Sequence, residues 1–240
     1  MDKFASKYSD NNWVMTEEQL IKREQFGITT SNSSPFSIVP VGYDTSKANI
    51  MNAEKNNIYN IIYVGAMRES TGPELAIKTM PLLVKRFPKI KLTMIGAGND
   101  TDKLKQLIKD LRIGRYVNFL GYIANFWDLA DIIVKNSIGL APYKPIPGSF
   151  SYYSDPSKIK LYMCCGLPVI TTNLTTMSNL VRKTKSGIII NYSEKSLFDA
   201  IIYLLSNKKR YKLYENAAIK LSEKFDINHI LNTAFDKIPN

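Results

Sequence analysis

The chain has 240 residues, and its hydrophobic fraction of 45% and charged fraction of 22% are those of an ordinary globular protein. Its 14 tyrosines and 10 phenylalanines exclude a disordered chain. The formal net charge of +11 indicates an anionic partner: a phosphorylated ligand, acidic lipid headgroups or nucleic acid. The lysines are scattered rather than gathered in one aromatic stripe, so we expect no nucleic-acid partner.

The sequence also bears on where the protein is located and on whether it binds a metal. No apolar run approaches the roughly 20 residues of a membrane-spanning helix, and the first residues lack the apolar core of a signal peptide, which favours the cytoplasm. Cys164 and Cys165 are adjacent, which suits reduced buried thiols better than a structural disulfide. His229 is the only histidine, and there is no Asp-x-Asp triplet, so we expect neither a metal nor another cofactor.

The first 57 residues predict two strands, 11–16 and 36–44, around a helix that starts at 17 and is closed by Gly27. Two isolated strands do not make a stable sheet, so residues 1–44 are expected to be the tail of another domain. The polar, Asn- and Lys-rich stretch 45–57 is predicted to be a linker.

From Asn60 onward, short apolar runs alternate with amphipathic stretches, beginning with a helix that starts at Pro73. The predicted strands are 60–65, 90–98, 116–123, 137–143, 167–172 and 187–192. Such alternation implies parallel strands joined by right-handed crossovers. We therefore predict an α/β fold over 58–225, with a doubly wound, mostly parallel, Rossmann-like sheet and flanking helices. Residues 226–240 are expected to form a last, separate helix, and ligands are expected at the carboxyl ends of the strands.

The stretch SDPSKIKLYMCCGLPVITTN, residues 154–173, predicts a helix with Asp155 as its N-cap and Pro156 as its first residue. Lys158 then falls in the first turn, where the helix dipole disfavours a cation by roughly 0.3 to 1 kcal/mol. The helix start, with Ser157 and Lys158, therefore suggests an anion site. A solvated surface lysine is the alternative.

Several motifs occur in the order MIGAGND, VNFLGYI, LAPY and KIKLYMCCGLPVITTN, after a strand that ends at Gly65. In this order they resemble the C-terminal half of group 1 GT-B glycosyltransferases over about residues 10–237. The resemblance implies that a nucleotide-sugar donor binds here and that the acceptor binds mostly to an N-terminal domain. Residues 1–44 would then be the tail of a truncated acceptor domain, and 226–240 the helix that crosses back onto it.

The chain departs from this family's pattern at two pairs of positions. Ala66 and Thr71 stand where many relatives carry phosphate-binding Arg and Lys, and Tyr153 and Leu161 stand where they carry two glutamates. Lys158 instead fits a variant branch that is similar to bacterial xanthan-type glucuronosyltransferases, which makes a uronic acid donor one option.

The resemblance implies two groups of site residues. For the donor phosphates they are Lys158, Ser157, Arg68, Gly65 and Gly98, and for the base and ribose Tyr122, Tyr153 and Leu161. Arg68 either replaces the absent cations or is an ordinary exposed loop arginine. No residue is a convincing catalytic base.

We therefore expect a glycosyltransferase-like protein, hexosyl- or glucuronosyl-transferring, that binds a nucleotide-diphosphate sugar for transfer to a glycan or lipid-linked acceptor. It is expected to be incomplete as a lone chain and to need a separate N-terminal acceptor domain. An acidic membrane surface at the inner membrane face is a further candidate partner. The alternative function is a non-catalytic nucleotide or nucleotide-sugar binding module, or a truncated relic.

Overall fold

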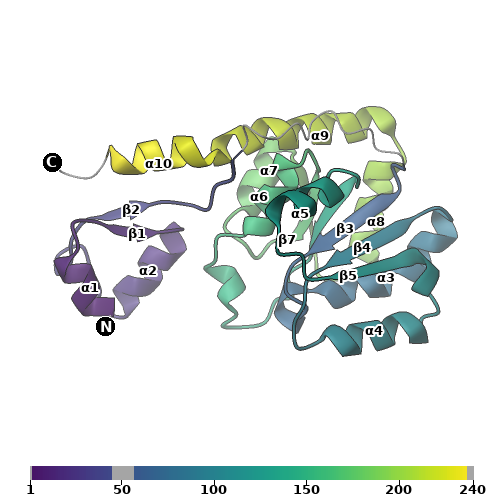
Figure 1. The fold of residues 1–240 in the computed structure, drawn as a ribbon, viewed down its shortest axis with the longest axis horizontal. Helices are drawn as coiled ribbons and strands as arrows, with labels where there is room; N and C mark the ends of the chain where they lie inside the picture. The colour runs from purple at the N-terminus through teal and green to yellow at the C-terminus, as the bar shows by residue number, and fades with distance from the viewer. Residues whose placement is uncertain (1, 45–56, 237–240) are drawn as a thin grey trace.

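The computed structural model describes residues 2–44 and 57–236. Its main part is a six-stranded sheet in which every neighbouring pair is parallel (Figure 1). The strands are β3 (Asn60–Val64), β4 (Lys91–Ile95), β5 (Val117–Gly121), β6 (Ile138–Ala141), β7 (Val169–Thr172) and β8 (Gly187–Ile190). Each lies within a range predicted from the sequence, and the predicted fold class is confirmed.

Helices cover both faces of the sheet, because the strands are apolar on both sides. Ile61 and Tyr63 pack into one core and Ile62 into the other, as the alternation of side chains along a strand requires. One face carries α3 (Pro73–Arg86), α4 (Thr101–Asp110) and α8 (Glu194–Leu205). The other carries α5 (Phe126–Ile133), α6 (Ser157–Cys164), α7 (Ser178–Thr184) and α9 (Lys208–Ser222). Helix α7 was not identified from the sequence.

The strand order is β5-β4-β3-β6-β7-β8, so the chain leaves β3 toward one edge of the sheet and returns to start again at β6. The order therefore reverses between β3 and β6. At such a point the loops that follow the two strands diverge to opposite faces and leave a crevice at the carboxyl ends. The fold alone thus points to the loops after Val64 and Ala141.

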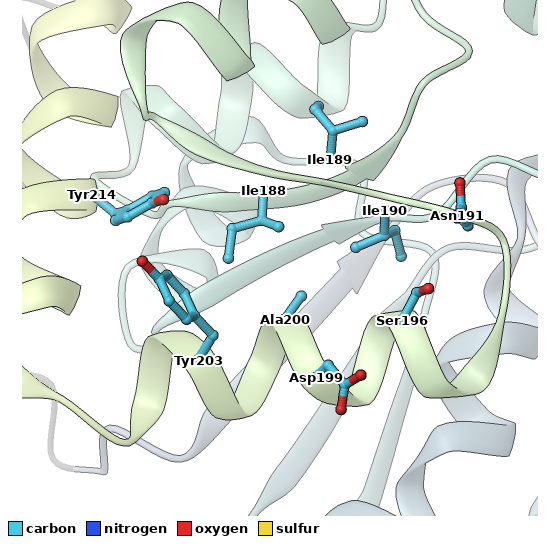
Figure 2. A pocket seen from close by; sticks show the side chains of 9 residues that line it. All are labelled: Ile188, Ile189, Ile190, Asn191, Ser196, Asp199, Ala200, Tyr203 and Tyr214. Carbon is cyan, nitrogen blue, oxygen red and sulfur yellow. The ribbon is translucent and has the colours of Figure 1, made fainter.

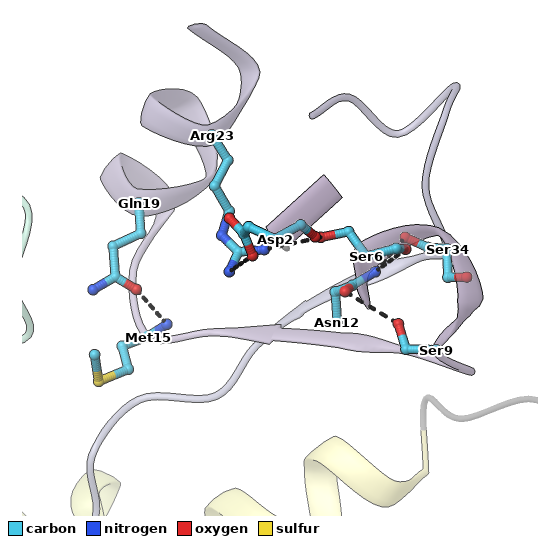
Figure 3. Close-up of polar contacts among 8 residues, drawn as sticks. All are labelled: Asp2, Ser6, Ser9, Asn12, Met15, Gln19, Arg23 and Ser34. Carbon is cyan, nitrogen blue, oxygen red and sulfur yellow. Dashed lines mark hydrogen bonds and ion pairs between the residues drawn. The ribbon is translucent and has the colours of Figure 1, made fainter. Parts of the chain in front are cut away.

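The amino-terminal residues form a smaller unit beside this sheet. It consists of α1 (Asp2–Tyr8), β1 (Asn12–Val14), α2 (Glu17–Gln25) and β2 (Phe36–Ile38), with β1 and β2 paired in parallel. Polar contacts tie it together (Figure 3): the Asn12 amide donates to the carbonyl oxygens of Ser6 (2.9 Å) and Ser34 (3.0 Å), and Arg23 pairs with Asp2 at 3.1 Å.

Helix α10 (Ile227–Phe235) follows α9 and a short 3-10 turn, Glu223–Phe225, and runs beside the amino-terminal unit (Figure 1). The rings of Trp13 and Phe235 meet there with centroids 5.6 Å apart. The carboxyl-terminal helix thus lies against residues from the start of the chain. Of the predicted linker 45–57, residues 45–56 lie outside the described residues.

Candidate functional site

A cavity of about 320 Å³ lies at the switch point of the sheet. It is bounded by the loops that follow β3 and β6 and by the amino end of α6. Its lining residues are Tyr43, Val64, Gly65, Ala66, Arg68, Thr71, Tyr143, Phe150, Ser151, Ser154, Asp155, Pro156, Ser157, Lys158 and Leu161. The structure therefore brings together Gly65, Arg68, Ser157, Lys158 and Leu161 among the residues predicted from the sequence.

Lys158 is the second residue of α6, and its side chain is half-buried. Its Nζ donates to the hydroxyl of Tyr63 at 3.3 Å and lies 4.3 Å and 5.0 Å from the ring centroids of Tyr63 and Tyr143. Lys158 is therefore not fully exposed, because its amine packs against two tyrosine rings. The backbone at Gly65 has φ +145°, which favours glycine, and a Cβ there would come within 2.7 Å of Lys158 Nζ, so the amine would have to move.

The electrostatics of Lys158 are those of a cation without a counter-charge. Burial, and to a lesser extent the positive charge of Arg68, lowers the pKa of Lys158 to about 7. No carboxylate among the described residues forms an ion pair with it. An anion entering the cavity would supply the missing charge and favour the protonated amine.

The loop after β3 presents Arg68 and is held in shape by its own contacts. Thr71, at one of the positions where relatives carry a lysine, donates its hydroxyl to the carbonyl oxygens of Ala66 (2.6 Å) and Arg68 (2.8 Å). Glu69 pairs with Lys144 at 2.5 Å, which links this loop to the loop after β6. Thr71 therefore shapes the loop, and Arg68, although exposed, is the second cation that lines the cavity.

The prediction that Asp155 caps α6 is wrong. The helix starts at Ser157, its N-cap position is Pro156, and no side chain caps it. Asp155 instead accepts from the backbone N–H of Val41 at 2.6 Å and pairs with Lys160 at 2.5 Å. A carboxylate with a buried ammonium within reach gains more from that ion pair than from a backbone N–H at a helix end.

The predicted base and ribose residues do not gather in one place. Leu161 lines the cavity and is buried. Tyr122, which follows β5, is 75% exposed and does not line it. Tyr153 is also outside the lining; its carbonyl accepts from Thr16 at 3.0 Å. Gly98, which was predicted for the donor phosphates, is also outside the cavity lining. It packs against the backbone of Met67, and a Cβ on Gly98 would come within 2.4 Å of the Met67 carbonyl oxygen.

Three tyrosines at or beside the cavity were missed by the sequence analysis: Tyr43 and Tyr143 line it, and Tyr63 contacts Lys158 from strand β3. Tyr63 lies in an apolar run and was counted only as part of a buried strand, although a tyrosine in such a run signals a hydroxyl that needs a partner. Its hydroxyl donates to the carbonyl of Ala66 at 3.0 Å. Tyr143 belongs to the LAPY motif, and burial raises its pKa well above the usual range. Tyr43 donates to the carbonyl of Ser157 at 3.1 Å.

A second hollow, of about 530 Å³, lies between the edge strand β8 and helix α8 (Figure 2). Its lining residues are Ile188, Ile189, Ile190, Asn191, Ser196, Asp199, Ala200, Tyr203 and Tyr214. It is larger than the switch-point cavity, but it offers no lysine, arginine or histidine, and Asp199 contributes a negative charge. Its chemistry does not suit a phosphate.

Within the parts of the chain that the structure describes, no three His, Cys, Asp or Glu side chains lie close enough to hold a metal ion. The two cysteines are free and buried, as expected. The exposed His229 lies on α10, away from the cavity. None of the described helices combines the length and the apolar character that crossing a membrane would require.

The parallel sheet and the cavity at its switch point define a doubly wound α/β domain. The family model described as "Glycosyl transferases group 1" matches residues 58–207, and the chain belongs to this family. The match begins just before β3 and ends just after α8, so it contains the whole six-stranded sheet and the cavity, apart from Tyr43.

Among curated proteins, the chain is similar to a poly(glycerol-phosphate) alpha-glucosyltransferase of Bacillus subtilis (strain 168), with 24% identity over 243 residues. That match covers 97% of this chain and 33% of the relative, so the chain spans about a third of the relative's length.

Solved structures show the same fold. A variant of S. aureus TarM in complex with fondaparinux, alpha-GlcNAc-glycerol and UDP superimposes with a TM-score of 0.75 at 19% identity, covering 99% of this chain and 45% of TarM. Anabaena HepE in complex with UDP and glucose gives 0.76 at 15% identity, covering 97% and 63%. The described residues therefore have the fold of part of a GT-B glycosyltransferase.

Proposed function

We propose that the switch-point cavity binds the diphosphate of a nucleotide-sugar donor and that the chain is the donor-binding part of a glycosyltransferase. The observation that carries this proposal is Lys158, an amine held at a helix start beside Gly65 with no carboxylate partner among the described residues. Cations and helix N–H groups stabilise a departing diphosphate as the glycosidic bond breaks. The UDP in the TarM and HepE complexes supports this class of ligand.

Calorimetric titration with UDP, GDP and their sugar conjugates tests the proposal. UDP or GDP is expected to bind in the micromolar range, and Lys158→Ala is expected to weaken binding at least tenfold, about 1.4 kcal/mol. Arg68→Gln should weaken it less, because that side chain is exposed.

Lys195→Ala is a matched control, since Lys195 is likewise the second residue of a helix, α8, but is exposed and lies outside the cavity. Equal losses for Lys158→Ala and Lys195→Ala, or no binding to any nucleotide, would refute the donor site.

For the transferred sugar, the proposal extends to a hexose or a uronic acid. The hexose is supported by the name of the B. subtilis relative, a glucosyltransferase, and the uronic acid by the DPSK pattern around Lys158. Competition between UDP-glucose and UDP-glucuronic acid for the cavity separates them. The acceptor we propose is a glycan or lipid-linked saccharide, bound largely by a separate N-terminal domain, and this rests on the family's two-domain organisation.

A non-catalytic nucleotide-sugar binding module is the second candidate. The observation that favours it is the cavity lining: among the described residues its only carboxylate is Asp155, which is held in an ion pair with Lys160 and is not free to act as a base. Both candidates share the donor site. Release of UDP from UDP-sugar in the presence of an added acceptor domain would favour the enzyme, and tight UDP binding without turnover the module. In neither candidate does the proposal require a metal.

An acidic membrane surface remains a proposed partner at the cytoplasmic face. It is supported by exposed basic residues on the side of the sheet away from the cavity: Arg86 at the end of α3, Lys89 in the loop before β4, and Lys208 and Lys209 at the start of α9. In sedimentation with phosphatidylglycerol vesicles, the wild type should pellet with the vesicles. More of the Arg86→Glu/Lys89→Glu variant than of the Lys103→Glu/Lys105→Glu variant should stay in the supernatant. Equal release would assign the attraction to net charge alone.

A further inference from the structure

The most deeply buried ion pair of the described residues lies at the wall of the cavity, which Asp155 lines and Lys160 does not. Asp155 and Lys160 form an ion pair of 2.5 Å, with side chains only 3% and 2% exposed. Burial lowers the pKa of Lys160, and the bond to Asp155 acts against that shift. The two residues flank Lys158, which stands between them at the start of α6.

Both members of this pair also bind one residue that is remote in sequence. The carboxylate of Asp155 accepts from the backbone N–H of Val41 at 2.6 Å, and Nζ of Lys160 donates to the backbone carbonyl of Val41 at 2.9 Å. The same Nζ lies 5.0 Å from the ring centroid of Phe225. A single residue is thus held at both its backbone groups by a buried pair of opposite charges.

The segment 39–43, which leads on from β2, is fixed at further points. The Tyr43 N–H donates to the carbonyl of Phe225 at 2.8 Å, and the N–H of Ile227 donates to the carbonyl of Tyr43 at 3.0 Å. The Tyr43 hydroxyl reaches the carbonyl of Ser157 in the first turn of α6. The segment therefore joins three elements: the amino-terminal unit, the start of α6 and the turn between α9 and α10.

A buried ion pair adds little net stability, because the desolvation of both charges offsets most of their attraction. What it provides is a fixed geometry, since each charge must keep its partner. Here the fixed geometry includes the backbone on both sides of Lys158. Anything that shifts segment 39–43 must either move the start of α6 or break a desolvated ion pair.

We infer that Asp155 and Lys160 are positioning residues: they fix Lys158 to segment 39–43, so that anion binding at Lys158 and the ordering of this segment are coupled. The inference rests on the proposed function for the identity of the anion. Coupling of this kind is reciprocal, so a nucleotide should protect the segment as much as the fixed segment favours the nucleotide.

The test compares wild type with Asp155→Leu/Lys160→Met, which removes both charges and keeps an apolar filling. The matched control is Lys212→Met/Glu215→Leu, which removes another ion pair, 2.6 Å long, on α9. The readouts are hydrogen exchange of the amides of residues 41–43 with and without UDP, UDP affinity by calorimetry, and thermal unfolding.

In the first double variant, the amides of 41–43 should exchange at least tenfold faster and UDP should bind about five- to tenfold more weakly, while the control pair leaves both unchanged. In wild type, UDP should slow exchange of 41–43. Unchanged exchange and affinity in Asp155→Leu/Lys160→Met would overturn the inference. If that variant does not fold, UDP binding to wild type without added protection of 41–43 would overturn it equally.

The two proposals fail in different ways. If wild type binds no nucleotide, the proposed function fails, but the exchange of 41–43 in the double variant without ligand still decides whether the ion pair fixes the segment. If UDP binds and Lys158→Ala abolishes binding while 41–43 does not respond, the donor site stands and the positioning role falls.

Discussion

Lys158 and Tyr63 meet across the switch point of the sheet, with the lysine amine 3.3 Å from the tyrosine hydroxyl and 4.3 Å from the ring centroid. The tyrosine lies near the carboxyl end of strand β3, and the lysine lies in the first turn of α6. The aromatic face stabilises the ammonium, and the absence of a carboxylate partner among the described residues leaves that charge available to a ligand.

The first prediction concerns protons. Because the pKa of Lys158 is about 7 in the free protein and an anion raises it, UDP binding at pH 7 should take up about half a proton. Affinity should then fall as pH rises above 7. Calorimetry in buffers of different ionisation enthalpy measures the uptake, and Lys158→Met should abolish it. Equal proton uptake in wild type and Lys158→Met would contradict the assignment.

The second prediction concerns the stability of the ligand-free protein. The pKa of Lys158 is lower in the folded than in the unfolded protein, so between these two pKa values the folded state binds fewer protons. Lys158 therefore destabilises the fold fully below pH 7, and this destabilisation decreases progressively up to about pH 10. Lys158→Met should therefore raise Tm at pH 6.5 by a few degrees, at about 2 to 4 °C per kcal/mol, and by less at pH 9. A lowered Tm at pH 6.5 would argue against a buried, unpaired cation.

The third prediction concerns Gly65. Alanine there must adopt φ +145° and place its Cβ 2.7 Å from Lys158 Nζ. We expect Gly65→Ala to destabilise the fold by about 1 to 3 kcal/mol and to remove nucleotide binding, measured by urea unfolding and calorimetry.

Gly166→Ala is the control for that change. Gly166 also has a positive φ, +69°, but it ends α6 away from the cavity, and its nearest neighbour to a Cβ is Ile219 at 3.6 Å. Its substitution should cost about 1 kcal/mol of stability and leave nucleotide affinity unchanged. If the two alanines behave alike toward UDP, the close approach at Gly65 has no role in binding.

The fourth prediction concerns the two cysteines. Burial raises the pKa of Cys164 to about 12 and that of Cys165 further, so neither is a thiolate at neutral pH. Native protein should react with a disulfide reagent slowly, and both thiols should react at once in guanidinium. Fast labelling of one thiol in native protein would show that α6 opens locally.

The sequence alone was enough for the order of the six strands of the main sheet and for most of the helices, because alternating apolar runs and periods of three to four residues are local properties. It also placed Lys158 in the first turn of a helix, which the structure confirms. It missed α7 and the short helix at Asp2–Tyr8, whose patterns are weak. The neighbours of Lys158 could not be read in the same way, since Tyr63 and Tyr143 reach it only after the strands pair.

Asp155 likewise separates what local sequence predicts from what tertiary contacts decide. By local rules an Asp-Pro pair begins a helix, and the sequence offered no reason to expect otherwise. The tertiary structure gave Asp155 a buried partner, Lys160, and a backbone partner, Val41, which lies 114 residues earlier in the chain. Likewise Tyr122 and Tyr153, placed near the donor by resemblance, lie outside the cavity lining. The sequence determined the strands and most of the helices, because their patterns are local. Packing between distant segments decided which charges are buried and which of them, such as Asp155 and Lys160, are paired.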